Sequence, residues 1–95
     1  MLKKRVEEIL NEQLNREFYS AYLYLSMSAY FDSTDLPGFA HHMKVQYQEE
    51  MAHAIRIFNY LSNVGGRVEL KAIAQPKNVW NGIIEVFEET HKHEC

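Results

Sequence analysis

Four side chains in this sequence have the chemistry and spacing to share a metal ion. Glu50 and His53 are three residues apart, which places both on one face of a helix, one turn from each other. Glu17 and Glu94 fall on the apolar repeats of two other segments, where an unpaired carboxylate is costly to bury. A shared cation removes this cost. Carboxylates with one imidazole suit iron or manganese, and zinc is also compatible.

Two long helices are expected to position these groups. Apolar residues recur at steps of three and four over about residues 2–32 and again over about 36–64, which predicts two amphipathic helices. The first inward stripe runs from Val6 and Ile9 through Glu17. Asp35 is the predicted N-cap of the second helix, and Gly65 the predicted C-terminal stop. The short turn between the helices predicts antiparallel neighbours.

The rest of the chain is expected to cross back and begin a third helix. Residues 65–81 have no helical period and contain Pro76, and so long a connection in a bundle typically runs the full length of a helix. Asn81 is the predicted N-cap of a helix over about 82–95. We therefore expect one all-α domain over residues 1–95: two long antiparallel helices, a crossover and the start of a third helix.

Composition narrows the classes of protein and partner. With 95 residues, of which one is a cysteine (Cys95), the chain has no internal disulfide and needs a partner chain or a metal to supplement a small core. A net charge of −3 argues against nucleic acid as a partner. No apolar run reaches the length of a signal or membrane segment. A cytoplasmic location is the expectation.

Several stretches resemble the N-terminal half of a bacterial or archaeal non-haem ferritin. The resemblance covers nearly the whole chain and implies a ferritin-like bundle. The stretches that carry it are residues 11–24, residues 48–54, residues 65–70 with Pro76 and Trp80, and Lys92-His93-Glu94.

The resemblance also implies metal ligands. Glu17, Glu50 and His53 would bind the first iron of a di-iron site, with both carboxylates near the two irons. Glu94 would bind the second iron, and Glu49 would help to hold a third, peripheral iron. The reaction implied is oxidation of Fe(II) by dioxygen, followed by storage of iron inside a hollow shell of identical subunits.

Tyr24 is the further candidate for a part in catalysis. It follows Glu17 by seven residues, close to two helical turns, so both side chains point the same way. A phenol beside a metal-bound carboxylate can donate a hydrogen bond or an electron. Met51 stands where haem-binding relatives carry their axial ligand, but residues 65–70 resemble the non-haem type, so we expect no haem.

The resemblance ends before the fourth long helix of a ferritin subunit, which supplies further ligands, so the chain resembles a truncated ferritin. We expect a partner chain to complete the four-helix bundle. Two copies of the first hairpin about a two-fold axis would bring together two sets of Glu17, Glu50 and His53. The alternative function is a helical oligomerisation module that keeps the hairpin but does not bind iron productively.

Overall fold

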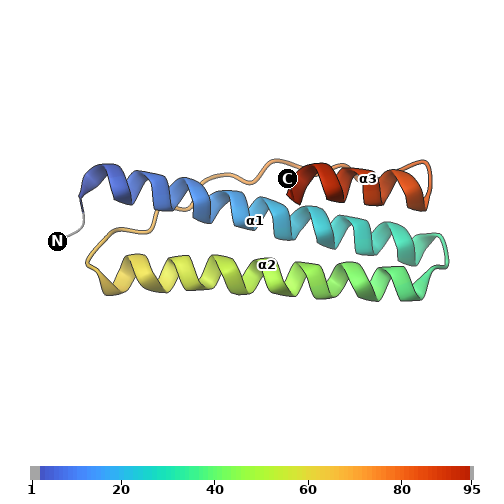
Figure 1. The fold of residues 1–95 in the computed structure, drawn as a ribbon, viewed down its shortest axis with the longest axis horizontal. Coiled ribbons are helices and arrows are strands. Elements are labelled where there is room, and N and C mark those ends of the chain that lie inside the picture. Colours follow the sequence, from blue (N-terminus) through green and yellow to red (C-terminus); the bar gives the residue numbers. More distant parts are fainter. Residues whose placement is uncertain (1–2, 95) are drawn as a thin grey trace.

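Three helices make up the regular structure of the protein. The computed structural model describes residues 3–94, and of Glu94 only the backbone. The helices are α1 (Lys4–Ser33), α2 (Pro37–Asn63) and α3 (Ile83–Glu94), and residues 3–94 contain no strand (Figure 1). The molecule is an elongated bundle of 50 × 22 × 18 Å. The expected all-α fold, with α1 and α2 antiparallel, is confirmed.

The turn between α1 and α2 differs from the prediction at Asp35. This residue is not the N-cap of α2, because Leu36 holds that position. Asp35 instead has a left-handed φ of 62°, which aspartate tolerates better than most residues. The backbone N–H of Leu36 donates to the carbonyl of Phe31 at 2.9 Å. Asp35 therefore ends α1 in the way that glycine ends many helices.

The end of α2 follows the prediction at Gly65. Its φ of 78° is left-handed, and the N–H of Gly66 donates to the carbonyl of Leu61 at 2.8 Å. This pairing satisfies a carbonyl of the last turn and directs the chain back toward α1.

The start of α3 differs from the prediction at Asn81. The helix begins at Ile83, so Gly82 precedes it and Asn81 lies outside. The Asn81 side chain donates to Glu85 at 3.2 Å, and Lys77 donates to the same carboxylate at 2.8 Å. The hydrogen bond from Lys77 lowers the pKa of Glu85. Glu85 thus ties the first turn of α3 to the crossover.

Two asparagines of α1 bind the crossover between α2 and α3. This segment runs along α1 from one end of the hairpin toward the other (Figure 1). Asn11 donates to the Arg67 carbonyl at 2.9 Å and accepts from the Glu69 N–H at 2.8 Å. Asn15, one turn later, donates to the Glu69 carbonyl at 2.8 Å and accepts from the Lys71 N–H at 2.9 Å. These amides pair with backbone groups that would otherwise lack a secondary-structure partner.

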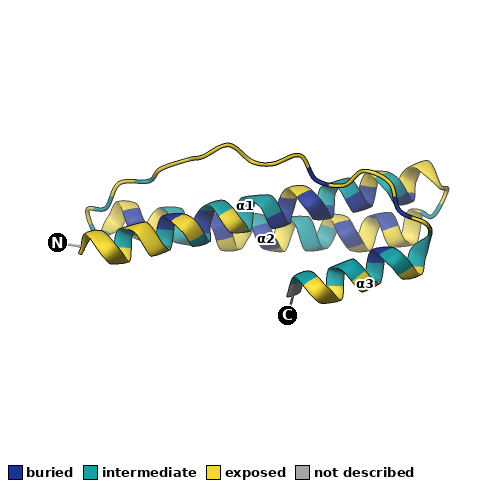
Figure 2. Cartoon of the chain, turned by 90° about the horizontal axis from the view of Figure 1, so that it is seen from above, coloured by how far each residue is buried: buried dark blue, intermediate teal, exposed yellow. Residues whose placement is uncertain are grey.

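The core lies between α1 and α2 and extends under α3, whereas most of the crossover is exposed (Figure 2). It forms two clusters, one on each side of the middle of the hairpin. The larger contains Leu23, Tyr24, Met27, Phe31, Ala40, Met43, Trp80 and Val86, and the smaller contains Leu14, Ala54 and Leu61.

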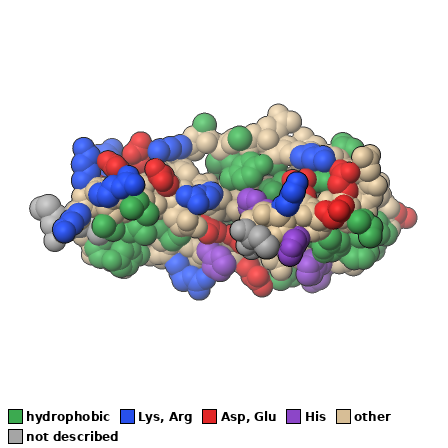
Figure 3. Space-filling model, turned by 45° about the horizontal axis from the view of Figure 1, so that its top comes forward, with side chains coloured by type: hydrophobic (Ala, Val, Ile, Leu, Met, Phe, Trp, Pro, Cys, Tyr) green, Lys and Arg blue, Asp and Glu red, His purple; other side chains and the backbone are tan. Residues whose placement is uncertain are grey.

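The N-terminal part of the predicted inward stripe is uncovered. Val6 is 40% and Ile9 is 46% exposed, although their spacing predicted burial. Figure 3 shows one group of hydrophobic side chains near the N-terminal end of the molecule, with others at the middle and at the opposite end. The reason is the position of α3, which lies along the other half of α1 (Figure 1). None of the helices in residues 3–94 combines the length and hydropathy that crossing a membrane requires.

The asparagine contacts predict a measurable stability difference. Asn11→Ala removes two hydrogen bonds to the crossover and is expected to lower the free energy of unfolding by about 1–3 kcal/mol. Asn59→Ala is the matched control, because Asn59 is exposed on α2 and its replacement by alanine gives the same increase in helix propensity. Urea unfolding of both variants measures the difference. Equal stabilities would show that Asn11 does not hold the crossover.

Candidate metal centre

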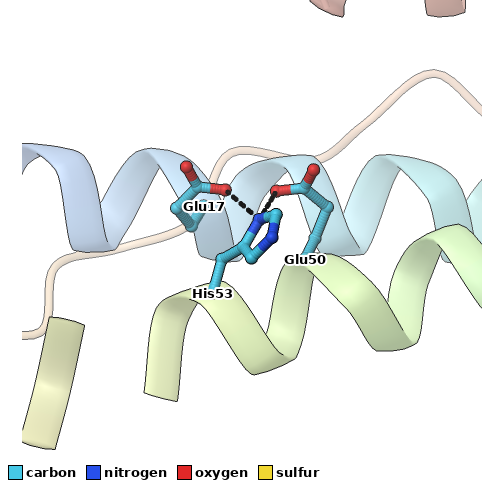
Figure 4. A group of neighbouring side chains, drawn as sticks. All are labelled: Glu17, Glu50 and His53. Atoms are coloured by element: carbon cyan, nitrogen blue, oxygen red, sulfur yellow. Dashed lines mark ion pairs between the residues drawn. The ribbon is translucent and has the colours of Figure 1, made fainter. Parts of the chain in front are cut away.

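Glu17, Glu50 and His53 meet between the two long helices. Glu17 comes from α1, and Glu50 and His53 come from adjacent turns of α2 (Figure 4). The Nδ1 atom of His53 lies 3.9 Å from Oε2 of Glu17 and 3.8 Å from Oε2 of Glu50. Each residue offers a ligand atom within 4.8 Å of the others, and no other His, Cys, Asp or Glu group in the described part of the chain meets that test.

The packing of α1 on α2 fixes the two carboxylates. Glu17 lies between Leu14 and Ala21 on α1, and Glu50 lies one turn before Ala54 on α2. All three apolar neighbours are buried. The carboxylates therefore share the apolar stripes of helices that pack together, so each is carried to the interface. The exposed fractions of the side chains are 17% for Glu17, 11% for Glu50 and 48% for His53.

A polar hollow adjoins this group. The amide nitrogen of Gln13 donates to Oε1 of Glu17 at 2.6 Å. Besides Glu17 and Glu50, the hollow is lined by residues that the sequence did not single out as site residues: Gln13, Arg16, Ser20 and His93. Gln13, Arg16 and Ser20 lie within one turn of Glu17, and that spacing is the signal that could have found them. His93 comes from a distant segment, and only its place beside Glu94 pointed to it.

The third helix reaches the hollow through His93. The Nε2 atom of His93 lies 2.6 Å from Oγ of Ser20, which joins the last turn of α3 to the middle of α1. The His93 ring meets the Tyr24 ring edge to face, with centroids 6.1 Å apart. Tyr24 itself is fully buried. The structure thus places the predicted tyrosine in the core between α1 and α3.

The structure gives different results for the two other predicted ligands, Glu94 and Glu49. The side chain of Glu94 lies outside the described part of the structure, although its backbone belongs to the turn of α3 that contains His93. Glu49 is exposed on α2 and is not part of the group formed by Glu17, Glu50 and His53. Cys95 also lies outside the described residues.

The position of α3 affects whether two hairpins can pack together about a two-fold axis. Val86 is fully buried, the Phe87 and Phe39 rings are 5.6 Å apart, and Oγ1 of Thr90 lies 3.5 Å from the sulfur of Met27. These contacts place α3 over the half of the hairpin that contains Met27 and Phe39. A second hairpin could pack there only if α3 moved away.

The donor set fits a divalent transition-metal ion. Two carboxylates and one imidazole supply hard oxygen and borderline nitrogen ligands, as iron, manganese and zinc require. The carboxylates also offset the ion's charge in a mostly buried place. The half-exposed His53 leaves the group open to solvent on one side.

A family comparison and curated relatives agree with this architecture. Residues 7–95 match the family described as "Ferritin-like domain". The chain is 39% identical over 94 residues to a bacterial non-heme ferritin of Campylobacter jejuni, covering 99% of this chain and 56% of that protein. It is 40% identical over 94 residues to a bacterial non-heme ferritin of Bacteroides fragilis, covering 99% of this chain and 59% of that protein.

Solved structures show the same fold. An open-pore ferritin from Archaeoglobus fulgidus matches with a TM-score of 0.96 and 47% sequence identity, over 99% of this chain and 58% of that one. An engineered closed form of that ferritin matches with the same score and identity, over 99% of this chain and 57% of that one. This chain therefore spans 56–59% of the length of these relatives.

The three-residue group predicts metal-dependent stability. Mn²⁺ at about 100 times its dissociation constant should stabilise the protein by about 2.7 kcal/mol. His53→Ala should lose most of this gain, because it leaves two ligands of three. His41→Ala is the control, since His41 is exposed on the same helix. Thermal unfolding with and without Mn²⁺ measures the effect, and an equal gain in both variants would contradict a site at His53.

Proposed function

This chain belongs to the ferritin-like domain family, which matches residues 7–95, and we propose on that basis that it binds Fe(II) and oxidises it with dioxygen. The observation that carries the proposal is the convergence of Glu17, Glu50 and His53, whose ligand atoms lie within 4.8 Å of one another. The iron is the substrate of the reaction. Manganese or zinc would be bound by the same three side chains.

The ligand set favours the oxidised product. Each Fe(II) gives one electron to dioxygen, so the positive charge on the iron rises by one. The carboxylates of Glu17 and Glu50 stabilise that added charge more strongly in a mostly buried site than they would in water. His53 supplies the neutral ligand and, being half exposed, faces the side from which Fe(II) and dioxygen can enter.

Further residues complete the proposed reaction. Glu94 is the proposed ligand of a second iron, because the turn of α3 that contains it reaches the hollow beside Glu17 and Glu50. Glu49 is the proposed ligand of a peripheral iron, and its exposed position suits an ion that enters or leaves. Tyr24 is the proposed donor of an electron or a hydrogen bond from the core between α1 and α3.

Storage of the oxidised iron requires more than one chain. The chain spans 56–59% of the length of its relatives, and α3 covers only part of the α1–α2 hairpin. We include self-association in the proposal because it would bury apolar side chains such as Val6 and Ile9, which are 40% and 46% exposed. A cytoplasmic location is also part of the proposal. The gain is about 25 cal/mol for each Å² of apolar surface buried.

These exposed apolar residues also favour the second candidate function, a helical oligomerisation module without productive iron binding. The two functions differ at Glu17. In a module with an empty site, Glu17→Ala removes a costly buried charge and should raise the free energy of unfolding. In an iron-binding protein it should also lower the stabilisation that added metal gives. Unfolding of Glu17→Ala with and without Mn²⁺ separates the two, and the absence of any metal effect in the parent protein would favour the module.

The ferroxidase proposal predicts the effect of removing Glu50. Glu50→Ala should slow the oxidation of Fe(II) in air by at least about 10-fold, because losing a ligand costs no less than losing a residue that supports one. Glu12→Ala is the control, since Glu12 is exposed on α1. Ferric absorbance and oxygen consumption measure the rate. If Glu50→Ala oxidises Fe(II) at the same rate and with the same iron stoichiometry as the parent protein, the proposal is contradicted.

A further inference from the structure

We propose that Gln13 is a positioning residue that selects which oxygen of Glu17 binds the metal. The inference rests on the proposed metal site at Glu17, Glu50 and His53 and adds a residue to its support. Gln13 precedes Glu17 by one turn of α1 and lines the same hollow. Its side chain contacts the carboxylate on the side away from His53.

The hydrogen bond has only one possible direction. An ionised carboxylate accepts and cannot donate, so the amide nitrogen of Gln13 must face Glu17. The distance from Nε2 to Oε1 is 2.6 Å, and hydrogen bonds to a charged acceptor are shorter than those to a neutral one. Oε1 therefore already accepts a hydrogen bond from Gln13. Oε2 is the oxygen directed toward His53, with 3.9 Å between Oε2 and Nδ1.

This arrangement presents one defined oxygen to the ion. Glutamate has several rotatable bonds, and immobilising a long side chain costs conformational entropy. Gln13 fixes the carboxylate before the metal arrives, so metal binding does not bear that cost. The amide also holds Oε1, which disfavours binding of the ion by both oxygens of Glu17. We therefore expect Glu17 to bind the metal through Oε2.

No other described side chain holds Glu17 in this way. Arg16 lines the hollow but is exposed and forms no ion pair with Glu17 in the described part of the chain. A cation at that position would neutralise the carboxylate and compete with the metal, whereas an amide donates a hydrogen bond without changing the charge of the site. Gln13 thus orients a ligand while leaving its full negative charge for the ion.

The test is a titration of the full chain with Co²⁺ under nitrogen, followed by the visible absorption of the bound ion. Gln13→Met keeps the length and helix propensity of the side chain but cannot donate. Its affinity for Co²⁺ should fall about 10- to 100-fold, the usual effect of losing a group that orients a ligand. The absorption bands should also shift, because a freed Glu17 can bind through both oxygens. Gln48→Met, the same change at an exposed position of α2, should alter neither property.

The outcomes separate this inference from the proposed function. If the parent protein binds Co²⁺ and Gln13→Met binds it with the same affinity and spectrum, the role of Gln13 is overturned and the site stands. A weaker affinity with an unchanged spectrum, or an equal loss in Gln48→Met, also overturns the selection of Oε2. If the parent protein binds no Co²⁺, the metal site and the role of Gln13 fall together.

Discussion

The placement of two carboxylates on the contact surface between α1 and α2 is the constraint on which the site depends. Glu17 and Glu50 occupy positions where the apolar pattern of each helix calls for a hydrophobic residue. Once the helices pack, both carboxylates are mostly removed from water. Mutual repulsion and desolvation then favour any arrangement that brings in a cation. The same hydrophobic packing that forms the hairpin therefore creates a place for a metal ion.

The crossover determines where the third helix can lie. A long segment without regular structure would ordinarily leave its backbone groups to water, but Asn11 and Asn15 pair with the backbone between Arg67 and Lys71. This fixes the path of the chain along α1. Glu85 then ties the start of α3 to that path through Asn81 and Lys77. The last turn of α3 arrives beside the carboxylates as a consequence, and His93 contacts Ser20 there.

The bundle is asymmetric about the metal group. On one side, α3 covers the aromatic cluster around Phe31. On the other side, Val6 and Ile9 remain partly exposed, and the half-exposed His53 lies near the boundary. A second hairpin could pack on the α3 side only if α3 moved away, so the self-association that we propose would use the N-terminal half of the hairpin instead. The proposed metal site and the proposed contact with a partner thus lie on adjacent parts of one surface.

The helical fold, the hairpin and the convergence of Glu17, Glu50 and His53 could be predicted from the residue pattern, because helical periodicity assigns residues to faces and short turns force neighbouring helices together. The sequence was wrong about Asp35 and Asn81 as N-caps, since capping depends on local backbone angles that residue type only biases. It also expected Val6 and Ile9 to be buried, because periodicity identifies a face but not what covers it. The position of α3, the crossover contacts of Asn11 and the hydrogen bond from Gln13 to Glu17 became known only from the folded structure. Those features depend on distances between segments remote in sequence, or on side-chain rotamers, and neither leaves a repeating pattern along the chain.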